Sequence, residues 1–208
     1  MRRVITEADI PQTGEFRIAS GSIITPSARD IAKDRGVKLV EVPADQLDST
    51  HLPAQTIALG SDHGGFALKR KLKPIFEELR LHVRDVGVDE EKPADYPDIA
   101  REVAEIVARG EAARGVIIDG AGIGSAIVAN KFPGIRAALC YDKASARNSR
   151  EHNDSNVLTL GGRLLTTSLA EDVLRVWLTT PFAGGRHAAR IQKITDIERA
   201  VKNWTPRS

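Results

Sequence analysis

The segment Asp119–Ser125 holds the densest set of groups that could do chemistry. Its sequence, DGAGIGS, places a carboxylate and a serine hydroxyl at the two ends of three alternating glycines. Glycines spaced in this way let backbone N–H groups approach an anionic ligand closely. The spacing differs from the dinucleotide fingerprint G-x-G-x-x-G. We therefore expect a cradle for an anion or oxyanion, ahead of a structural turn or a nucleotide site.

A second set of candidates combines histidine with arginine. His152 is followed by Asn153, and the later pair Arg186 and Arg190 is spaced i, i+4, which places both on one face of a helix. Two guanidinium groups on one face suit bidentate phosphate binding, although a solvated basic face has the same pattern. The histidines lack close pairing with each other or with carboxylates at ligand spacing, so we expect no metal site.

The elements that must position these residues alternate between strand and helix after residue 55. Such alternation predicts an α/β fold, with a parallel sheet covered by helices on both faces. Ligands bind such sheets at the carboxyl ends of the strands, which singles out Asp62, His63, Asp119 and Arg163. The expected strands are 56–63, 82–87, 115–119, 135–140 and 156–162, and the expected helices are 66–80, 96–109, a short one ending at 130, 143–151, 168–179 and 186–204.

Composition narrows the class of protein. The chain has 208 residues with 30 basic and 28 acidic side chains, a balance that gives no reason to expect nucleic acid or a membrane as partner. No apolar run approaches the length of a membrane-spanning helix. The single cysteine, Cys140, excludes an intrachain disulfide and fits a reducing interior, so we expect a cytoplasmic protein.

Five segments together resemble the ribose-5-phosphate isomerase B family, which also contains galactose-6-phosphate isomerase subunits and tetrose-phosphate isomerases. They are GSDHGGFALK, DYPDIA, GAGIGSAIVANKFPGIRAALC, SREHNDSNVLTLGGR and WLTTPFAGGRHAARIQKI. The resemblance runs from about residue 56 to 200. The resemblance implies a Rossmann-like α/β/α sandwich with a central parallel five-stranded sheet. It also implies a homodimer or homotetramer whose site draws on both subunits, with no metal and no organic cofactor.

The resemblance implies roles for individual residues as well. His152 matches the histidine that opens the sugar ring. Asp119 stands where many members have a cysteine base, and Ser125 stands where others have a glutamate base. We therefore expect Asp119 to be the base, or the site to have lost its base. The residues expected to bind substrate, with the three arginines on the phosphate, are Asp62, His63, Tyr96, Gly120, Ala121, Gly122, Ile123, Gly124, Ser125, Asn153, Arg163, Arg186 and Arg190.

Three functions follow from this resemblance. The first is isomerisation of ribose 5-phosphate to ribulose 5-phosphate by proton transfer through an enediolate. The second keeps that chemistry and changes the substrate to a tetrose or hexose phosphate. The third is a non-catalytic protein that binds a sugar phosphate or serves assembly, and it is suggested by the loss of the usual cysteine at Asp119.

Residues 1–55 form an extension ahead of the expected isomerase domain, 56–208. Within it, Thr25 as N-cap, Pro26 at the first helical position and Gly36 as the stop predict a helix, and KLVEV predicts a short strand after it. We expect this extension to be too small to form its own core. It resembles segments of enzymes associated with bacterial microcompartments. Residues 1–50 would then dock on the enzyme's own oligomer, a partner enzyme or a shell protein, or simply pack on their own domain.

Overall fold

The computed structural model describes residues 4–7, 10, 15–42 and 56–201. The chain divides into two compact units, Met1–Pro53 and Ala54–Ser208. The larger unit buries two apolar clusters and the smaller unit buries one of its own.

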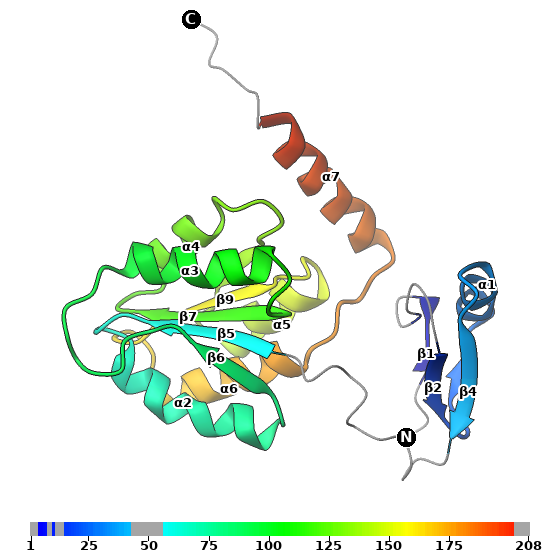
Figure 1. Ribbon diagram of the computed structural model, residues 1–208, viewed down its shortest axis with the longest axis horizontal. Helices are drawn as coiled ribbons and strands as arrows, with labels where there is room; N and C mark the ends of the chain where they lie inside the picture. Colours follow the sequence, from blue (N-terminus) through cyan, green and yellow to red (C-terminus); the bar gives the residue numbers. More distant parts are fainter. Residues whose placement is uncertain (1–3, 8–9, 11–14, 43–55, 202–208) are drawn as a thin grey trace, which may run out of the picture. The chain divides into compact units, whose positions relative to one another are not determined.

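The larger unit is built on a parallel five-stranded sheet with the strand order β6-β5-β7-β9-β8 (Figure 1). This architecture confirms the predicted α/β sandwich. The strands are β5 (Thr56–Ser61), β6 (His82–Asp85), β7 (Arg114–Asp119), β8 (Ala137–Leu139) and β9 (Val157–Gly161). The helices are α2 (Phe66–Glu78), α3 (Tyr96–Ala108), α4 (Ile123–Ala129), α5 (Lys143–Glu151), α6 (Thr167–Thr179) and α7 (Arg186–Val201).

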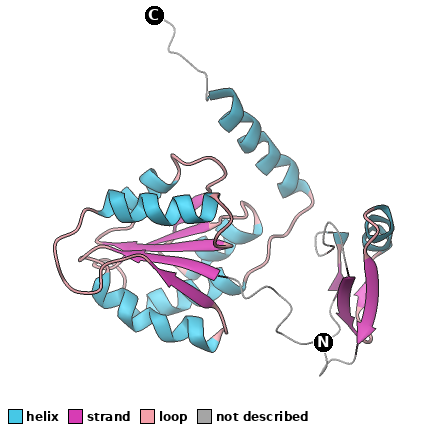
Figure 2. Cartoon of the chain, viewed as in Figure 1, coloured by secondary structure: helices cyan, strands magenta, loops and turns pink. Residues whose placement is uncertain are grey.

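Alternation along the strands explains the two helical layers. On β7, Val116 and Ile118 belong to a cluster with α2 and α6, whereas Ile117 belongs to a second cluster with α3 and α4. Successive strand side chains point to opposite faces, so each central strand supplies both clusters. Helices accordingly cover both faces of the sheet (Figure 2). The same alternation places the side chain of Asp119 on the face of α3 and α4.

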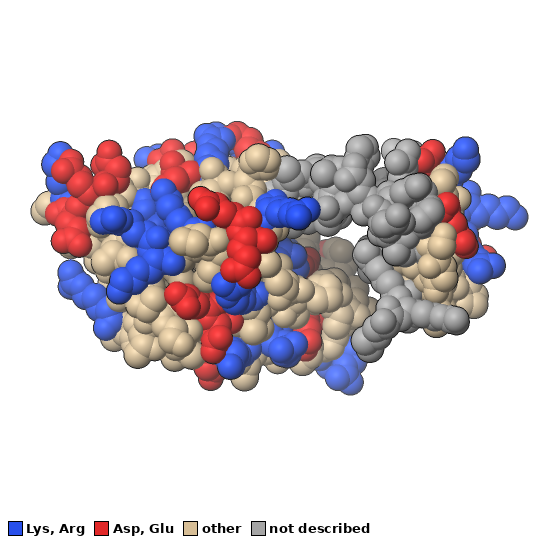
Figure 3. Space-filling view, turned by 90° about the horizontal axis from the view of Figure 1, so that it is seen from below, with Lys and Arg blue, Asp and Glu red and all other residues tan. Residues whose placement is uncertain are grey.

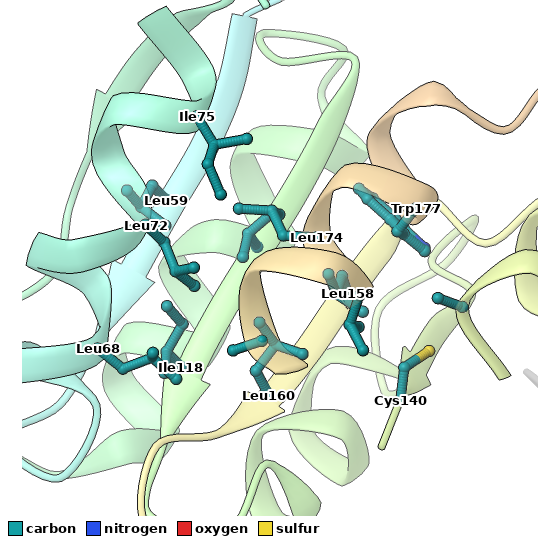
Figure 4. Packing of buried hydrophobic residues seen from close by; sticks show 14 of the residues in the cluster. Leu59, Leu68, Leu72, Ile75, Ile118, Cys140, Leu158, Leu160, Leu174 and Trp177 are labelled. Atoms are coloured by element: carbon teal, nitrogen blue, oxygen red, sulfur yellow. The ribbon is translucent and has the colours of Figure 1, made fainter. Parts of the chain in front are cut away.

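The cluster on the α2 and α6 side is closed by Trp177 and Cys140, both almost fully buried (Figure 4). Two arginines secure the end of α6: Arg114 donates to Leu178 O at 2.9 Å, and Arg150 donates to Thr180 O at 3.3 Å. Burial, and then the charge of Arg150, lowers the pKa of Arg114 to about 10. These contacts fix the start of the segment that leads into α7.

The smaller unit pairs β1 (Val4–Ile5) with β3 (Ile23–Ile24) and β2 (Glu15–Ala19) with β4 (Lys38–Val42), both in parallel. Its helix α1 (Pro26–Asp34) is capped as predicted, because Thr25 Oγ1 accepts from Ala28 N at 3.2 Å. The expectation that this extension has no core of its own was wrong. Strand pairing and α1 bury an apolar cluster of Ile5, Ile10, Ile18, Ala28, Ala32 and Val37.

Basic and acidic side chains are interspersed on the face shown in Figure 3. Among the described residues, no helix has the length and apolar character needed to cross a bilayer.

Candidate active site

A hollow of about 310 Å³ lies at the carboxyl ends of β5, β7 and β9, the three central strands. This is where an open parallel sheet is expected to bind ligands, and the volume is at the small end of the range for ligand sites. The sheet thus brings together predicted residues from four separate segments. The residues that line the hollow include Asp62, His63, Tyr96, Asp119, Gly120, Ala121, Gly124 and Arg163.

The loop after β5 supplies a carboxylate and an imidazole. Asp62 is buried, and its Oδ1 accepts a hydrogen bond from Gly65 N at 2.9 Å. His63 is exposed, and its Nδ1 accepts from Ala94 N at 3.4 Å. Because Nδ1 is an acceptor, a neutral His63 carries its proton on Nε2. The imidazole therefore has an N–H group to offer a ligand.

The carboxylate of Asp119 is almost fully buried and receives four hydrogen bonds from its own loop. Oδ1 accepts from Ala121 N at 2.7 Å and from Gly122 N. Oδ2 accepts from Ser125 N at 3.1 Å and from Ser125 Oγ at 2.5 Å. Asp119 thus organises the glycine loop, in the manner of a helix cap.

The backbone conformation of the glycine loop is consistent with these contacts. Gly122 has φ of 78°, a left-handed conformation that favours glycine, and directly precedes α4. Since the amides of Ala121 and Gly122 donate to Asp119, they are not the part of the predicted cradle that faces a ligand. The remaining cradle amides are those of Gly120, Ile123 and Gly124.

Two further side chains border this loop. A Cβ on Gly124 would lie 2.4 Å from the ring of Tyr96, so that ring packs directly against the loop. A Cβ on Gly120 would lie 3.7 Å from Cδ of Arg163, which places the arginine stem along the loop. Arg163 itself is exposed and brings a positive charge to the hollow.

A second group of predicted residues lies around the stacked rings of His152 and His187. The predicted loop residues Gly122, Ile123 and Ser125 belong to neither group, since they do not line the hollow. The two ring centroids are 4.2 Å apart and the planes differ by 6°. Glu151 O accepts from Ala183 N at 3.0 Å, which ties the end of α5 to the segment before α7. Among the described residues that line the hollow, His152, Asn153, Arg186 and Arg190 do not appear.

Burial lowers the pKa of His187, and the positive charges of His152, Arg186 and Arg190 lower it further. The two arginines are thus close enough to His187 for their charges to act on it. Both are exposed at the start of α7. This second group is a cationic patch able to face an anion.

Asn148 is a member of this group that the sequence reasoning missed. Its Nδ2 lies 2.9 Å from Nδ1 of His152, which is one helical turn further along the chain, directly after α5. The i, i+4 spacing of an amide and an imidazole was the available signal.

Among the residues that the structure describes, no three His, Cys, Asp or Glu side chains gather as metal ligands. The groups that the candidate site offers a ligand are carboxylates, imidazoles, guanidinium groups and backbone amides.

Comparison with known proteins covers the larger unit. Residues 57–194 match the family model described as Ribose/Galactose Isomerase. Ribose-5-phosphate isomerase B of Escherichia coli is 44% identical over 143 residues, which are 69% of this chain and 96% of that protein. D-erythrulose-4-phosphate isomerase of Pectobacterium atrosepticum is 37% identical over 150 residues, which are 71% and 98% respectively.

A solved structure of ribose-5-phosphate isomerase B from Clostridium thermocellum is 47% identical to this chain, with a TM-score of 0.68. The match covers 70% of this chain and 99% of that one. Because the family match begins at residue 57, the smaller unit lies outside it.

Proposed function

Because this chain belongs to the ribose/galactose isomerase family, we propose that it interconverts the aldose and ketose forms of a sugar phosphate, with ribose 5-phosphate and ribulose 5-phosphate as the pair. The observation that carries this proposal is the meeting of Asp119, the glycine loop and Arg163 in one hollow at the strand ends. A carboxylate, backbone amides and a guanidinium are the groups that an enediolate phosphate requires.

In this proposal Asp119 is the base. Isomerisation removes the proton from C2 of the open-chain aldose and forms an enediolate. The proton is then returned to C1 while the proton of the O2 hydroxyl passes to O1, so that C2 becomes the carbonyl carbon. A carboxylate performs this reaction in triosephosphate isomerase. The hydrogen bonds from Ala121 N and Ser125 N hold the Asp119 carboxylate in one orientation. Little side-chain conformational entropy therefore has to be lost on reaching the transition state.

The loop amides and the neighbouring side chains complete the site. The amides of Gly120, Ile123 and Gly124 stabilise the enediolate oxygen, as expected of preorganised donors. Asp62 and His63 hold sugar hydroxyls, and Tyr96 borders the sugar. The exposed guanidinium of Arg163 binds the phosphate, for which Arg is well suited.

His152, Asn153, Arg186 and Arg190 act, in this proposal, in the site of a second copy of the chain. Their absence from the lining of the chain's own hollow supports that assignment within the described residues. His152 opens the sugar ring and Asn153 binds the sugar. Arg186 and Arg190 complete the phosphate site, so each catalytic centre needs two subunits.

The helix α7 supports a homodimer or homotetramer. Ile194, Ile197 and Val201 lie on one stripe at i, i+3 and i+7, and each is about half exposed or more. Together with Pro133 and Ile135 they line an apolar groove beside α7. We propose that a second copy covers this groove, because a shared site requires the copies to associate permanently.

A tetrose phosphate is the second candidate substrate, because one relative is named D-erythrulose-4-phosphate isomerase. The proposed base, cradle and arginines serve either sugar. A tetrose 4-phosphate has no free hydroxyl with which to close a five-membered ring, so its isomerisation would not require ring opening by His152.

For the smaller unit we propose a role in assembly. It has its own apolar cluster and lies outside the family match, so the chemistry does not require it. Through residues 1–50 it would dock on a protein partner, such as a shell protein or partner enzyme of a bacterial microcompartment.

The test is a coupled assay of the purified protein against aldose phosphates of four to six carbons, with binding measured in parallel. We expect turnover, highest with ribose 5-phosphate, that survives chelators. Tight binding of every sugar with turnover of none would instead support a non-catalytic binder.

A further inference from the structure

We propose that Arg163 transmits the binding of the substrate's phosphate to the glycine loop, so that phosphate binding raises kcat as well as affinity. The link is the main chain of the turn after β9, which carries Arg163 and bonds to Asp119 and Gly120. This inference rests on the proposed function and deepens it, because it assigns the distant phosphate a part in the chemistry.

Two main-chain hydrogen bonds join this turn to the glycine loop. Gly162 N donates to Asp119 O at 2.7 Å, and Arg163 N donates to Gly120 O at 3.1 Å. Each acceptor belongs to a planar trans peptide unit, in which the C=O and the N–H point in opposite directions. The turn therefore sets the orientation of two successive peptide planes of the loop.

The first of these planes carries the amide of Gly120, which we assign to the enediolate oxygen. Because Asp119 O points to Gly162, the N–H of Gly120 is directed away from the turn. An added Cβ on Gly64 would lie 3.2 Å from Gly120 N, and both glycines line the hollow. The second plane carries the N–H of Ala121, which donates to Asp119 Oδ1 at 2.7 Å. The turn thus positions the proposed oxyanion donor and a donor to the proposed base.

Close packing prevents the turn from moving independently of its neighbours. A Cβ on Gly161 would lie 2.8 Å from Ala121 O, and one on Gly162 would lie 2.7 Å from Gly64 O. Main chains approach this closely only where glycine leaves out the Cβ. Since closely packed groups transmit displacement, a shift of the turn is passed to the glycine loop and to the loop after β5.

The side chain of Arg163 faces a ligand while its main chain holds the loop. The residue is exposed and lines the hollow, and its Cδ would lie 3.7 Å from a Cβ on Gly120. Within the described ranges, its guanidinium has no ion-pair partner. The turn is therefore bonded to the loop by its main chain, and the charge at its tip is left for the phosphate.

A phosphate on this guanidinium restrains the turn, and the turn restrains the loop. Binding energy from a part of the substrate that does not react is used in this way to orient the groups that do. A catalytic group misplaced by about 1 Å lowers the rate by about 10²-fold, so a small restraint on this loop has a large effect on kcat.

The other two arginines of the proposed phosphate site lack this link. Arg186 and Arg190 are exposed at the start of α7. Neither forms a hydrogen bond with the glycine loop in the part of the chain that the structure describes. We therefore expect them to contribute to affinity for the phosphate, and Arg163 alone to connect that affinity to turnover.

The experiment separates the sugar from its phosphate. The full-length protein is given D-erythrose, an aldose without the phosphorylated fifth carbon, in deuterium oxide with and without phosphite dianion. Exchange of the C2 proton of D-erythrose is followed by ¹H NMR. We expect saturating phosphite to raise the exchange rate of the wild type by about tenfold or more, because phosphite occupies the phosphate site and orders the loop.

Variants of three arginines give different expected results. Arg163→Ala should lose the activation and lower kcat for ribose 5-phosphate by about tenfold or more. Arg163→Lys, which keeps a positive charge on the turn, should retain part of both. Arg186→Ala should instead raise KM and the phosphite concentration for half-activation, with activation still reached at saturation. Arg175→Ala removes a surface partner of Glu78 and is the matched control, expected to behave as the wild type.

A second measurement does not depend on turnover. Amide hydrogen exchange of peptides covering residues 119–125 is measured by mass spectrometry with and without inorganic phosphate. Phosphate should slow this exchange in the wild type, and at a higher concentration in Arg186→Ala, but not in Arg163→Ala. A phosphate ligand without a link to the loop would leave the exchange unchanged in all three proteins.

The outcomes separate this inference from the proposed function. An active wild type that phosphite does not activate overturns the inference, as does an unchanged rate of amide exchange on addition of phosphate. An Arg163→Ala protein that differs from the wild type in KM alone also overturns it. A wild type that neither converts ribose 5-phosphate nor exchanges its C2 proton overturns the proposed function.

Discussion

At the scale of single residues, Asp119 both organises the glycine loop and is the base that we propose. The two roles predict separate effects of one substitution. Asp119→Asn keeps the shape but loses proton acceptance and part of the loop contacts. We expect kcat to fall at least about 10²-fold with little change in KM, and the free energy of unfolding to fall by about 1–2 kcal/mol. Steady-state kinetics and urea denaturation measure the two effects.

Asp119→Cys is the matched comparison, because the resemblance places a cysteine there in many members of the family. A thiolate is the active form of such a base, so activity should be retained with a pH profile displaced upward. An Asp119→Asn protein as active as the wild type would contradict the assignment.

The candidate residues at this scale were predictable because each ends a strand or lies in a compact motif. Asp62, Asp119 and Arg163 were expected together at the sheet edge, and they line one hollow. The direction of a carboxylate was not predictable. Whether Asp119 faces a ligand or its own loop depends on the turn that Gly122 allows, and no residue pattern specifies that angle. Their roles in catalysis stay predictions.

At the scale of elements, the buried Lys69 of α2 joins that helix to β6. Its Nζ donates to Asp85 Oδ1 at 2.9 Å and to Val88 O at 2.6 Å. Burial raises the pKa of Asp85, but hydrogen bonds from Lys73, Lys69 and Gly87 N outweigh it, so the pKa stays below its ordinary value.

This contact predicts an acid-sensitive contribution to stability. The pKa of Asp85 is lower in the folded chain, so between the two pKa values the unfolded chain binds more protons. The stabilisation is therefore present above about pH 4 and is lost as pH falls through the folded pKa. At neutral pH, Asp85→Asn should lower the free energy of unfolding by about 2 kcal/mol, less than for a fully buried pair.

Denaturation of wild type and Asp85→Asn at pH 7 and below pH 4 tests this expectation. The difference between the two proteins should shrink in acid. Glu111→Gln, which removes a surface partner of Arg84, is the control and should change stability little. A difference that stays constant in acid would show that charge is not the cause.

The elements of the larger unit were predictable because buried strands and amphipathic helices alternate there with clear periodicity. The edge strand β8 (Ala137–Leu139) is shorter than the predicted 135–140, since an edge strand has a pairing partner on one side only. The pairings of β1 and β2 were missed. Their runs are too short to show a period, and parallel pairing joins residues that are distant in sequence.

At the scale of the whole molecule, the division into two units predicts that chemistry and assembly can be separated. Deleting residues 1–53 removes a unit with its own apolar cluster. We expect kcat and KM on the sugar phosphate to stay within a few-fold, while the association of the protein with other proteins changes. Kinetics and light scattering of both forms measure this. A folded truncation with greatly reduced kcat would place the smaller unit in the chemistry.

The proposed sharing of sites predicts recovery of activity between two inactive variants. Asp119→Ala and His152→Ala each disable one half of a composite site. After equal mixing and subunit exchange, half the dimers are mixed and each has one intact site, so about a quarter of wild-type activity should return. Mixing Asp119→Ala with itself is the control. Absence of recovery, with exchange verified by mass spectrometry, would argue for a site within one chain.

The burial of the single cysteine predicts that the activity resists reagents that modify thiols. Cys140 is 1% exposed in the core under α5, and burial raises the pKa of its thiol, so little reactive thiolate forms. Because the base that we propose is a carboxylate and not a thiol, native protein should keep its activity under iodoacetamide or peroxide, while the denatured chain is alkylated at Cys140. Inactivation that tracks native alkylation by mass spectrometry would contradict this. Sugar-phosphate isomerisation by this chain should therefore continue through an oxidative burst that halts thiol-dependent enzymes.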